Sequence, residues 1–483
     1  MNKNILYLLY FTVYSLILLF FGKSGFKKTN NASDFFVAGN SFGLAISLFT
    51  FAGTWFSAAS MQGVTGSVFS YGYSTVLYSV LPWFFGAILL MILAPKLRTY
   101  DILTLPEFFY LRYDSKWLQA MGGLMIVITY THYIIIQVRG FGIVISELLD
   151  INYLFASVLV YIFIIYTSFG GLFSVAKTDG LNIILVSIGV VVAAMLILNE
   201  VGGIGVMMEN AASINTRPFP EFPHITEKGG LLDPFAKGQM PPIVTFTSLF
   251  GWGLGLASNP QYTTRIMAAK SNKVAVKMIW QSVILLTILY LGLIIIGMGG
   301  RVLVPTIEAV STVDEVFPYL VNNVIDSPLS GFILISMAAA AISTANSQLV
   351  IAASGLTYDF YKNLINSNIK EEHFLNLNRL FIFLIGTVSL IMAIKPPDSL
   401  LVYGGYIWGF YSASFLIPLY GGVFWKKSTK EGAISAFIVG LISIIFFITK
   451  DLNSMIHPAM PSVFASAATF YFVSKYFYNK ANR

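Results

Sequence analysis

The sequence predicts an all-α integral membrane protein with about 13 transmembrane helices, and two observations point to this class. Of its 483 residues, 56% are hydrophobic and only 11% are charged, whereas a soluble domain carries roughly 25% charged residues. The hydrophobic residues also gather in runs of about 20, the length that a helix needs to cross a bilayer. Because lipid offers no hydrogen-bond partners, each run is predicted to be helical.

The apolar runs follow one another with no independent soluble domain between them, so residues 1–483 are expected to form a single transmembrane domain. Residues 4–22 are too long for a signal peptide, and no small-residue cleavage site follows them. We therefore expect a retained first helix. The predicted spans are residues 4–22, 41–69, 71–94, 119–147, 152–169, 177–199, 242–263, 274–299, 329–357, 376–395, 400–424, 432–449 and 459–477.

The positions of Lys and Arg orient these helices. With the N-terminus outside, the loops on the inner side hold about three times as many Lys and Arg residues as those on the outer side. This bias predicts a multi-pass protein of the plasma (cytoplasmic) membrane, with the N-terminus outside and the C-terminus inside. Because orientation accounts for the net charge of +7, no nucleic-acid partner is expected.

Residue composition also limits the chemistry. The chain has no cysteine, which excludes disulfides, thiolate metal sites and a cysteine nucleophile. Its four histidines are not at metal-ligand spacing. No constellation of nucleophile and base is visible either, so we expect no catalytic residues and no enzyme.

Two predicted helices carry small and hydroxyl residues in mid-span, at residues 52–60 (AGTWFSAAS) and 251–260 (GWGLGLASNP). Interrupted helices of this kind free backbone carbonyls that can coordinate a cation. Close packing of neighbouring helices is the alternative interpretation, because small residues also serve that purpose.

A third segment, residues 337–347 (MAAAAISTANS), places the hydroxyls of Ser343 and Thr344 next to each other. Sodium is a hard cation that prefers oxygen ligands, and these hydroxyls would suit it together with carbonyls from a broken helix. The alternative is that the hydroxyls bond back to carbonyls of the preceding turn.

Two ionisable residues fall in or beside predicted spans. Arg139 is the only Arg or Lys predicted to lie within a span, and its guanidinium could hold a carboxylate of a ligand or form an internal ion pair. Asp179 is predicted near the inner end of the span 177–199. There it would either be an acid at the helix N-terminus or help to coordinate an ion.

At these residues the sequence resembles the sodium:solute symporter family. The resemblance lies in five motifs in the expected order. They are residues 105–108 (LPEF), residues 170–179 (GGL to TD), residues 252–269 (WGLG to RIMAA), residues 340–349 (AAISTANSQL) and residues 422–427 (GVFWKK).

This resemblance implies the LeuT-type fold, in which five helices are followed by five inverted ones. The first repeat would span residues 41–199 and the second residues 242–424. One extra helix, residues 4–22, would precede them, and two, within residues 432–477, would follow. This count agrees with the spans found from hydropathy alone.

The resemblance also implies ligands for sodium, Na+. A principal site would use carbonyls and hydroxyls from the first and eighth core helices, and a possible second site would add an acid. In the second site, Asn346 replaces a hydroxyl residue of the family, and Lys177 could compete for the acid. The principal ligands are Gly53, Phe56, Ala340, Ser343 and Thr344, and those of the second site are Asp179, Ser343, Asn346 and Ser347.

Substrate residues are implied by a further resemblance, between residues 137–140 (QVRG) and the members that carry sialate and related acids. Arg139 would then hold a substrate carboxylate. Trp55 stands where proline symporters have an acid and sugar symporters an amide, which argues against both substrate classes. The implied substrate residues are Arg139, Trp55, Ser57, Ala58, Gln62 and Trp252.

We therefore predict a sodium-coupled symporter that imports a small organic solute, such as sialic acid or another organic acid, by alternating access. The first alternative is a symporter of a neutral or zwitterionic solute, such as proline or a sugar. The second is a channel or a substrate sensor with the same fold. The expected partners are the small-molecule substrate, sodium and the lipid bilayer.

Overall fold

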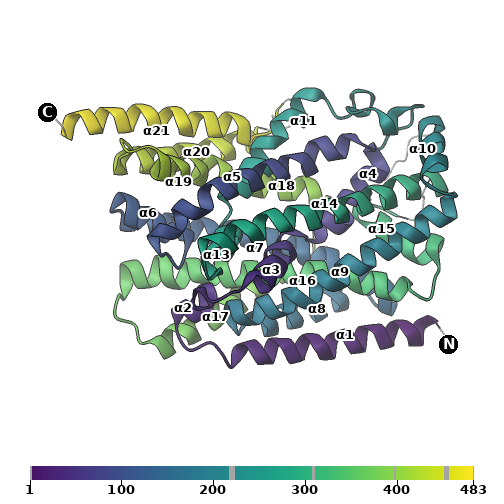
Figure 1. Ribbon diagram of the computed structural model, residues 1–483, viewed down its shortest axis with the longest axis horizontal. Coiled ribbons are helices and arrows are strands. Elements are labelled where there is room, and N and C mark those ends of the chain that lie inside the picture. Colours follow the sequence, from purple (N-terminus) through teal and green to yellow (C-terminus); the bar gives the residue numbers. More distant parts are fainter. Residues whose placement is uncertain (1–2, 217–222, 307–309, 396–398, 451–455, 482–483) are drawn as a thin grey trace.

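The computed structural model is almost entirely helical in the part of the chain that it describes, residues 3–216, 223–306, 310–395, 399–450 and 456–481. Long helices run along the longest axis of the molecule, and the two termini lie at opposite ends (Figure 1). We name the end at which α1 (Lys3–Phe26) begins the N-face, and the opposite end the C-face.

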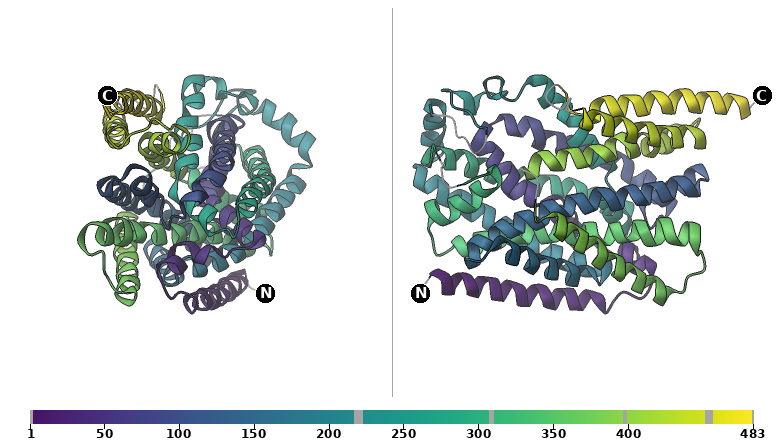
Figure 2. Two further views of the ribbon diagram at one scale, coloured as in Figure 1. Left: turned by 60° about the vertical axis from the view of Figure 1, so that its left-hand side comes forward. Right: turned by 180° about the vertical axis from the view of Figure 1, so that it is seen from behind.

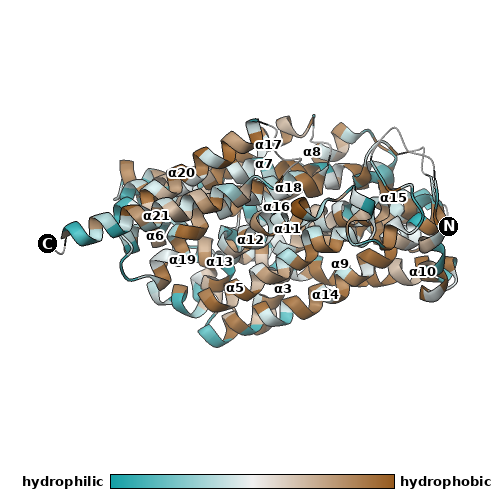
Figure 3. Cartoon of the chain, turned by 90° about the horizontal axis from the view of Figure 1, so that it is seen from above, coloured by the Kyte–Doolittle hydropathy of each residue, from teal (hydrophilic) through white to brown (hydrophobic). Residues whose placement is uncertain are grey.

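Nine helices in the described ranges are long and apolar enough to cross a membrane, and one bent pair makes a tenth. Apolar residues cover much of their surface, and hydrophilic residues gather at the two ends (Figure 3). Phe20, Met195 and Phe472 are each more than 60% exposed. Such surfaces fit lipid rather than water. The nine are α1, Val76–Tyr100 (with α5, Leu81–Leu97), α7 (Lys116–Leu149), α9 (Gly171–Val201), α14 (Asn272–Leu303), Ser330–Ile365 (with α16, Ser330–Ser354), α17 (Glu371–Met392), Leu400–Phe424 (with α18, Leu400–Tyr411) and α20 (Lys430–Thr449).

The other predicted spans are shorter, broken or less apolar in the structure. Residues 152–169 correspond to α8 (Tyr153–Ser168), and residues 459–477 to α21 (Ala459–Ala481). Residues 242–263 are divided among α11 (Pro242–Ser248), η7 (Leu249–Gly253), α12 (Leu254–Ser258) and α13 (Pro260–Ala268).

Side-chain caps fix where several long helices begin. Ser115 Oγ accepts a hydrogen bond from the Leu118 amide at the start of α7, and Ser271 Oγ accepts one from Val274 at the start of α14. Each cap satisfies one of the amide groups that the first turn of a helix leaves without a partner.

The bent pair comprises α3 (Leu44–Trp55) and the helix formed by η2 (Ala59–Val64) and α4 (Thr65–Tyr71), which meet at 56°. The backbone turns at Phe56, where ψ is 98°. A second break separates α12 from α13 at Asn259, where ψ is 130°. The ring of Pro260 explains this second break, because it disfavours helical backbone at the preceding residue.

The helical pieces α3 and α13 meet at the C-face through a short backbone bridge, and α16 runs through the middle of the bundle. The Phe42 amide donates to Ala268 O at 3.0 Å, and the Lys270 amide donates to Phe42 O at 2.9 Å. Nearly every residue of α16 is buried. By contrast, α1 and the pair α20–α21 flank opposite sides of the bundle (Figures 1 and 2).

Candidate functional site

The break after α3 leaves backbone groups without their helical partners near the centre of the molecule. The Phe56 amide still donates to Ala52 O at 2.9 Å, and the helix then stops. The Ala58 amide, which would continue the helix, donates instead to Oε1 of Gln137 on α7 at 3.1 Å. The carbonyls of Gly53 and Thr54 are therefore available to other donors or to a cation.

Hydroxyl groups of α16 lie against these carbonyls. Ser343 Oγ is 2.8 Å from Gly53 O and 3.1 Å from Ala340 O, and Thr344 Oγ1 is 3.4 Å from Thr54 O. The structure thus brings three of the residues predicted for sodium, Gly53, Ala340 and Ser343, into direct contact. Ser343 therefore bonds back to the preceding turn of its own helix, as the alternative interpretation has it, and also to the broken helix, while its role as a sodium ligand stays a prediction.

Neutral oxygens make up the contact between α3 and α16. Within the described ranges, no group of three or more His, Cys, Asp or Glu residues could hold a metal ion. Hydroxyl and carbonyl oxygens suit a hard monovalent cation, which a site without a cluster of carboxylates can still bind.

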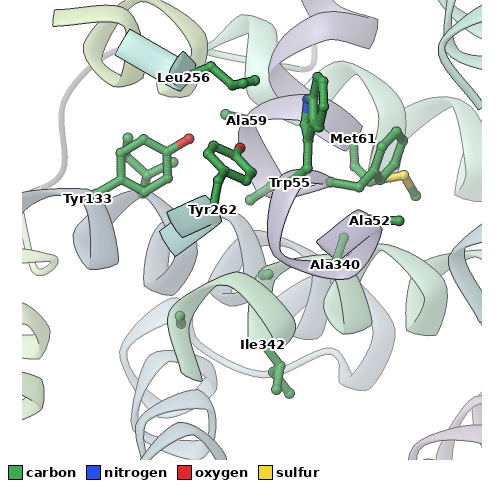
Figure 4. Packing of buried hydrophobic residues seen from close by; sticks show 14 of the residues in the cluster. Ala52, Trp55, Ala59, Met61, Tyr133, Leu256, Tyr262, Ala340 and Ile342 are labelled. Atoms are coloured by element: carbon green, nitrogen blue, oxygen red, sulfur yellow. The ribbon is translucent and has the colours of Figure 1, made fainter. Parts of the chain in front are cut away.

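Aromatic rings fill the space beside the break. Trp55 lies 5.8 Å from Tyr262, and Trp252 lies 5.1 Å from Trp408, between ring centroids. Tyr133 of α7 is stacked on Trp408 at 6.1 Å. Figure 4 shows Trp55, Tyr133 and Tyr262 next to one another, above Ala340 of α16. Trp55 and Trp252, both predicted for the substrate, therefore belong to one buried aromatic cluster.

A second polar cluster lies where α3, α9, α13 and α16 meet. Asp179 Oδ2 accepts from Thr50 Oγ1 at 2.6 Å and from Nη2 of Arg265 at 3.4 Å. Arg265 also donates to the hydroxyl of Ser347. Both the arginine and the aspartate side chains have no exposed surface.

This cluster contains two of the residues predicted for a second sodium, Asp179 and Ser347. Arg265 contacts Asp179 and Ser347, whereas the side-chain oxygen and nitrogen of Asn346 have no hydrogen-bond partner. Lys177 donates to Ser24 of α1. A guanidinium therefore already supplies positive charge between two of the predicted ligands.

The comparison with family profiles decides what kind of protein has this site. The profile of the sodium:solute symporter family matches residues 35–440, which is most of the chain. The chain belongs to the sodium:solute symporter family. Sodium is its coupling ion, and this symporter is a transporter rather than an enzyme.

Curated relatives of the symporter agree with this assignment. It is 29% identical to the sodium/proline symporter 2 of Staphylococcus saprophyticus, over 96% of this chain and 91% of that protein. It is also 29% identical to a sodium/proline symporter of Staphylococcus aureus strain JH9, again over 96% of this chain and 91% of the relative.

Solved structures agree on the fold. A Na+-coupled sialic acid symporter in a substrate-bound outward-open state superposes with a TM-score of 0.76 at 19% identity, covering 97% of this chain and 98% of the other. MhsT in complex with L-phenylalanine superposes with a TM-score of 0.57 at 13% identity, covering 90% and 98%. The symporter therefore has a LeuT-type fold.

At the N-face, Arg139 contacts a loop between α14 and α15 (Val316–Leu320). We call residues 310–315 the lid segment; they include η8 (Val313–Glu315). Arg139 Nε lies 3.8 Å from Asp314 Oδ2, and Arg139 Nη2 donates to Thr312 at 3.2 Å. The carboxylate of Asp314 also accepts from the amide of Leu400, at the start of α18.

The lid segment packs tightly on the helices below it. A Cβ atom at Gly66 of α4 would overlap the carbonyl of Val313, so only glycine permits this contact. Ser311 and Thr312 line two cavities of about 490 Å³ each. Burial raises the pKa of Asp314 to about 7, although Arg139 and the Leu400 amide act to lower it.

The substrate residues predicted on either side of the break are buried but do not all meet. Ser57, Ala58 and Gln62 lie against α7, where Gly140 faces Ala58 and Gln62. Arg139 lies on the same helix, and its contacts include Asp314 and Thr312. Arg139 thus forms an internal ion pair with Asp314 in this structure, and its binding of a ligand carboxylate stays a prediction.

Sequence reasoning missed Arg265, Asp314 and the capping role of Gln137. We expected the span 242–263 to end before Arg265, and Arg139 to be the only Arg or Lys within a span. The first expectation is wrong because α13 continues to Ala268 and buries Arg265. The second is wrong because Arg301 lies buried within the candidate span Asn272–Leu303. The interpretation of Asp179 as an acid at a helix N-terminus is also wrong, since α9 begins at Gly171. A single charged residue in an otherwise uncharged motif, residues 252–269, was the one available signal for Arg265.

Proposed function

We propose that this symporter imports a small organic solute bearing a carboxylate, coupled to sodium, by alternating access. One observation carries the proposal. The Ser343 hydroxyl lies against the Gly53 and Ala340 carbonyls, so a helix without a break is joined to a broken one at neutral oxygens. A cation there, held also by Phe56 and Thr344, would stabilise one arrangement of the two helices.

The carboxylate is the chemistry that the relatives have in common. Proline, which the curated relatives carry, and sialic acid, which the structural neighbour carries, both bear one. The proline relatives favour a zwitterionic amino acid, although Trp55 differs from the acid expected in proline symporters. Arg139, Trp55, Ser57, Ala58, Gln62 and Trp252 make up the proposed substrate region.

We further propose a multi-pass arrangement in the plasma membrane with 13 spans, in which α8, the broken segment of residues 242–268 and α21 complete the set. The N-face would then be outside and the C-face inside. The two inverted repeats would span residues 41–199 and 242–424, with α1 before them and α20–α21 after them. In this orientation the lid segment lies on the outer side.

Coupling follows from general energetics. One positive charge that moves inward across about 100 mV supplies roughly 2.3 kcal/mol, enough for a concentration ratio on the order of tens. Sodium and substrate must each raise the affinity of the other by the same factor. A sodium ion that joins α3 to α16 beside the aromatic cluster would meet this requirement, because both ligands would favour one arrangement of the break.

The test is uptake of radiolabelled L-proline and N-acetylneuraminate into proteoliposomes. With an inward sodium gradient and a negative interior, the wild-type protein should accumulate one of them above its external concentration. Replacing sodium by potassium should abolish accumulation, and so should Ser343→Ala combined with Thr344→Ala. Equilibration without accumulation would indicate a channel, and sodium-dependent binding without uptake would indicate a sensor.

The double variant needs its own control for folding. Loss of two hydroxyls that each contribute about 1 kcal/mol leaves the protein folded. Its melting temperature without sodium should therefore stay close to that of the wild type, while the stabilisation by added sodium disappears. Uptake that is unchanged in the double variant would overturn the proposed sodium site.

A further inference from the structure

Two buried glutamines flank the start of the helix that follows the break. Gln137 of α7 accepts the Ala58 amide through Oε1, which fixes the orientation of its side-chain amide. The other end of the amide, Nε2, is therefore the end available to a further partner, and it has no hydrogen-bond partner in the structure. Gln137 has no exposed surface. A donor is thus held in a defined direction where the helix resumes.

Gln62 lies one helical turn beyond Ala58. Its Oε1 is turned toward Gly140 of α7, where any larger side chain would displace it and Ala58. Its Nε2 has no hydrogen-bond partner either, and the residue is 1% exposed. Gln137 contacts Ala58 and Gly140 contacts both Ala58 and Gln62, so the two amide donors belong to the same contact between two helices.

Buried donors without acceptors destabilise a protein, and a ligand that supplies acceptors removes that cost. In this structure the Ala58 amide occupies the oxygen of Gln137, and the oxygen of Gln62 faces Gly140, so the N–H end of each side chain is the one that lacks a partner. A carboxylate offers several lone-pair sites and no donor, whereas a sugar hydroxyl brings a donor for which these amides have no acceptor. The pair therefore fits a carboxylate better than a polyol.

We propose that the side-chain amides of Gln62 and Gln137 bind the substrate carboxylate in the closed arrangement, while Asp314 engages Arg139. This inference rests on the proposed function, and it assigns the symporter's specificity for a carboxylate to two uncharged N–H donors, the side-chain amides of Gln62 and Gln137. Tyr133, one turn from Gln137 on α7, belongs to the aromatic cluster and places an apolar surface beside the donors. The favoured solute is a compact carboxylate with an apolar body.

The test is Gln137→Glu, which keeps an acceptor for the Ala58 amide and replaces the N–H donors by a second oxygen. Binding of L-proline and N-acetylneuraminate, and of the carboxamide of each, is measured on purified protein in sodium. The affinity of the preferred carboxylate should fall about 10- to 100-fold, and its preference over the carboxamide should be lost. Gln62→Glu should give the same pattern.

Two controls separate binding from folding. Stabilisation by sodium alone should be the same in both variants and the wild type, because the hydrogen bonds of Ser343 and Thr344 are with Gly53, Ala340 and Thr54 and not with either glutamine. Gln239→Glu adds the same charge at an exposed loop position and should change neither affinity. A purely structural role for the glutamines would lower both affinities in parallel and leave the preference for the carboxylate intact.

The outcomes distinguish the inference from the function on which it rests. If wild-type protein binds a carboxylate and both variants keep the same preference, the inference is overturned and the proposed function stands. If wild-type protein binds neither carboxylate but binds a neutral solute in sodium, the proposed substrate chemistry and the inference both fall.

Discussion

Two buried arginine–aspartate pairs lie in different parts of the symporter, and they differ in what they connect. At the N-face, Arg139 of α7 pairs with Asp314 of a loop, at 3.8 Å. Among α9, α13 and α16, Arg265 pairs with Asp179, at 3.4 Å, so that both partners lie on long or broken helices. The loop that carries Asp314 can move away from Arg139 without a change in the helices, whereas Arg265 and Asp179 can separate only if α13 and α9 move relative to each other.

The surroundings of the pairs extend this difference. Arg265 and Asp179 share their cluster with Thr50 and Ser347, so four helical pieces meet at one ion pair. Asp314 instead ties the lid segment to the first amide of α18 and to α7. The pair between Arg139 and Asp314 can therefore separate when one loop moves, whereas separating Arg265 from Asp179 requires packed helices to move.

The largest expected effect follows from removing a partner of the helix pair. Arg265→Ala leaves the carboxylate of Asp179 buried without its cation, which costs about 3–5 kcal/mol. We expect a marked fall in melting temperature in detergent, largely restored when Asp179→Leu is combined with Arg265→Leu. The control is Asp326→Ala, which removes an exposed pair with Lys3 worth about 0–1 kcal/mol. Equal falls in melting temperature for Arg265→Ala and Asp326→Ala would show that the buried pair stabilises the protein no more than the exposed one.

A smaller and different effect is expected for Asp314→Ala. Removing this anchor should open the lid segment rather than unfold the protein, because the loop can rearrange around Arg139. The chain has no cysteine, so Ser67→Cys in the cavity lined by the lid segment reports its opening. We expect labelling by an impermeant maleimide to accelerate more than about tenfold. Labelling at exposed Asn323→Cys should not change, and an unchanged rate at position 67 would count against the lid.

The smallest effect concerns pH. The pKa of Asp314 is raised to about 7 in the closed lid, above its usual value of 3.8, because burial and Glu315 outweigh Arg139 and the Leu400 amide. The closed lid therefore binds a proton more tightly than an open, solvated one, and a fall in pH through 7 favours closure. Labelling at position 67, normalised to position 323, should slow by up to about tenfold from pH 8 to pH 6. Asp314→Asn should remove this dependence.

The sequence allowed the fold and part of the site to be predicted because both depend on local patterns. The break at Asn259 follows from the proline after it, and the hydroxyls among alanines at residues 343 and 344 marked a polar position on an apolar helix. Both signals lie within a few residues. The family resemblance, now confirmed, added the pairing between helices.

Arg265 and Asp314 could not be predicted in the same way, because their roles depend on partners far away in the sequence. Arg265 is defined by Asp179, 86 residues earlier, and by Ser347, 82 residues later. Asp314 lies in a loop rich in polar residues, where an acidic residue is common. Its burial against α7 and α18 is visible only in the structure. In the sequence, Gln137 is likewise one polar residue on an apolar helix. Its role depends on the Ala58 amide of the broken helix, which only the structure places beside it.

The bridge between Phe42 and residues 268–270 has a consequence for movement at the C-face. It joins the residue just before α3 to the residues at the end of α13 by two backbone hydrogen bonds, which only a substitution that removes an amide, such as proline at position 42 or 270, would break. A rotation of one half-helix should therefore carry the other along. At the C-face the two half-helices would then move as one body, with Phe56 and Asn259 as the pivot points.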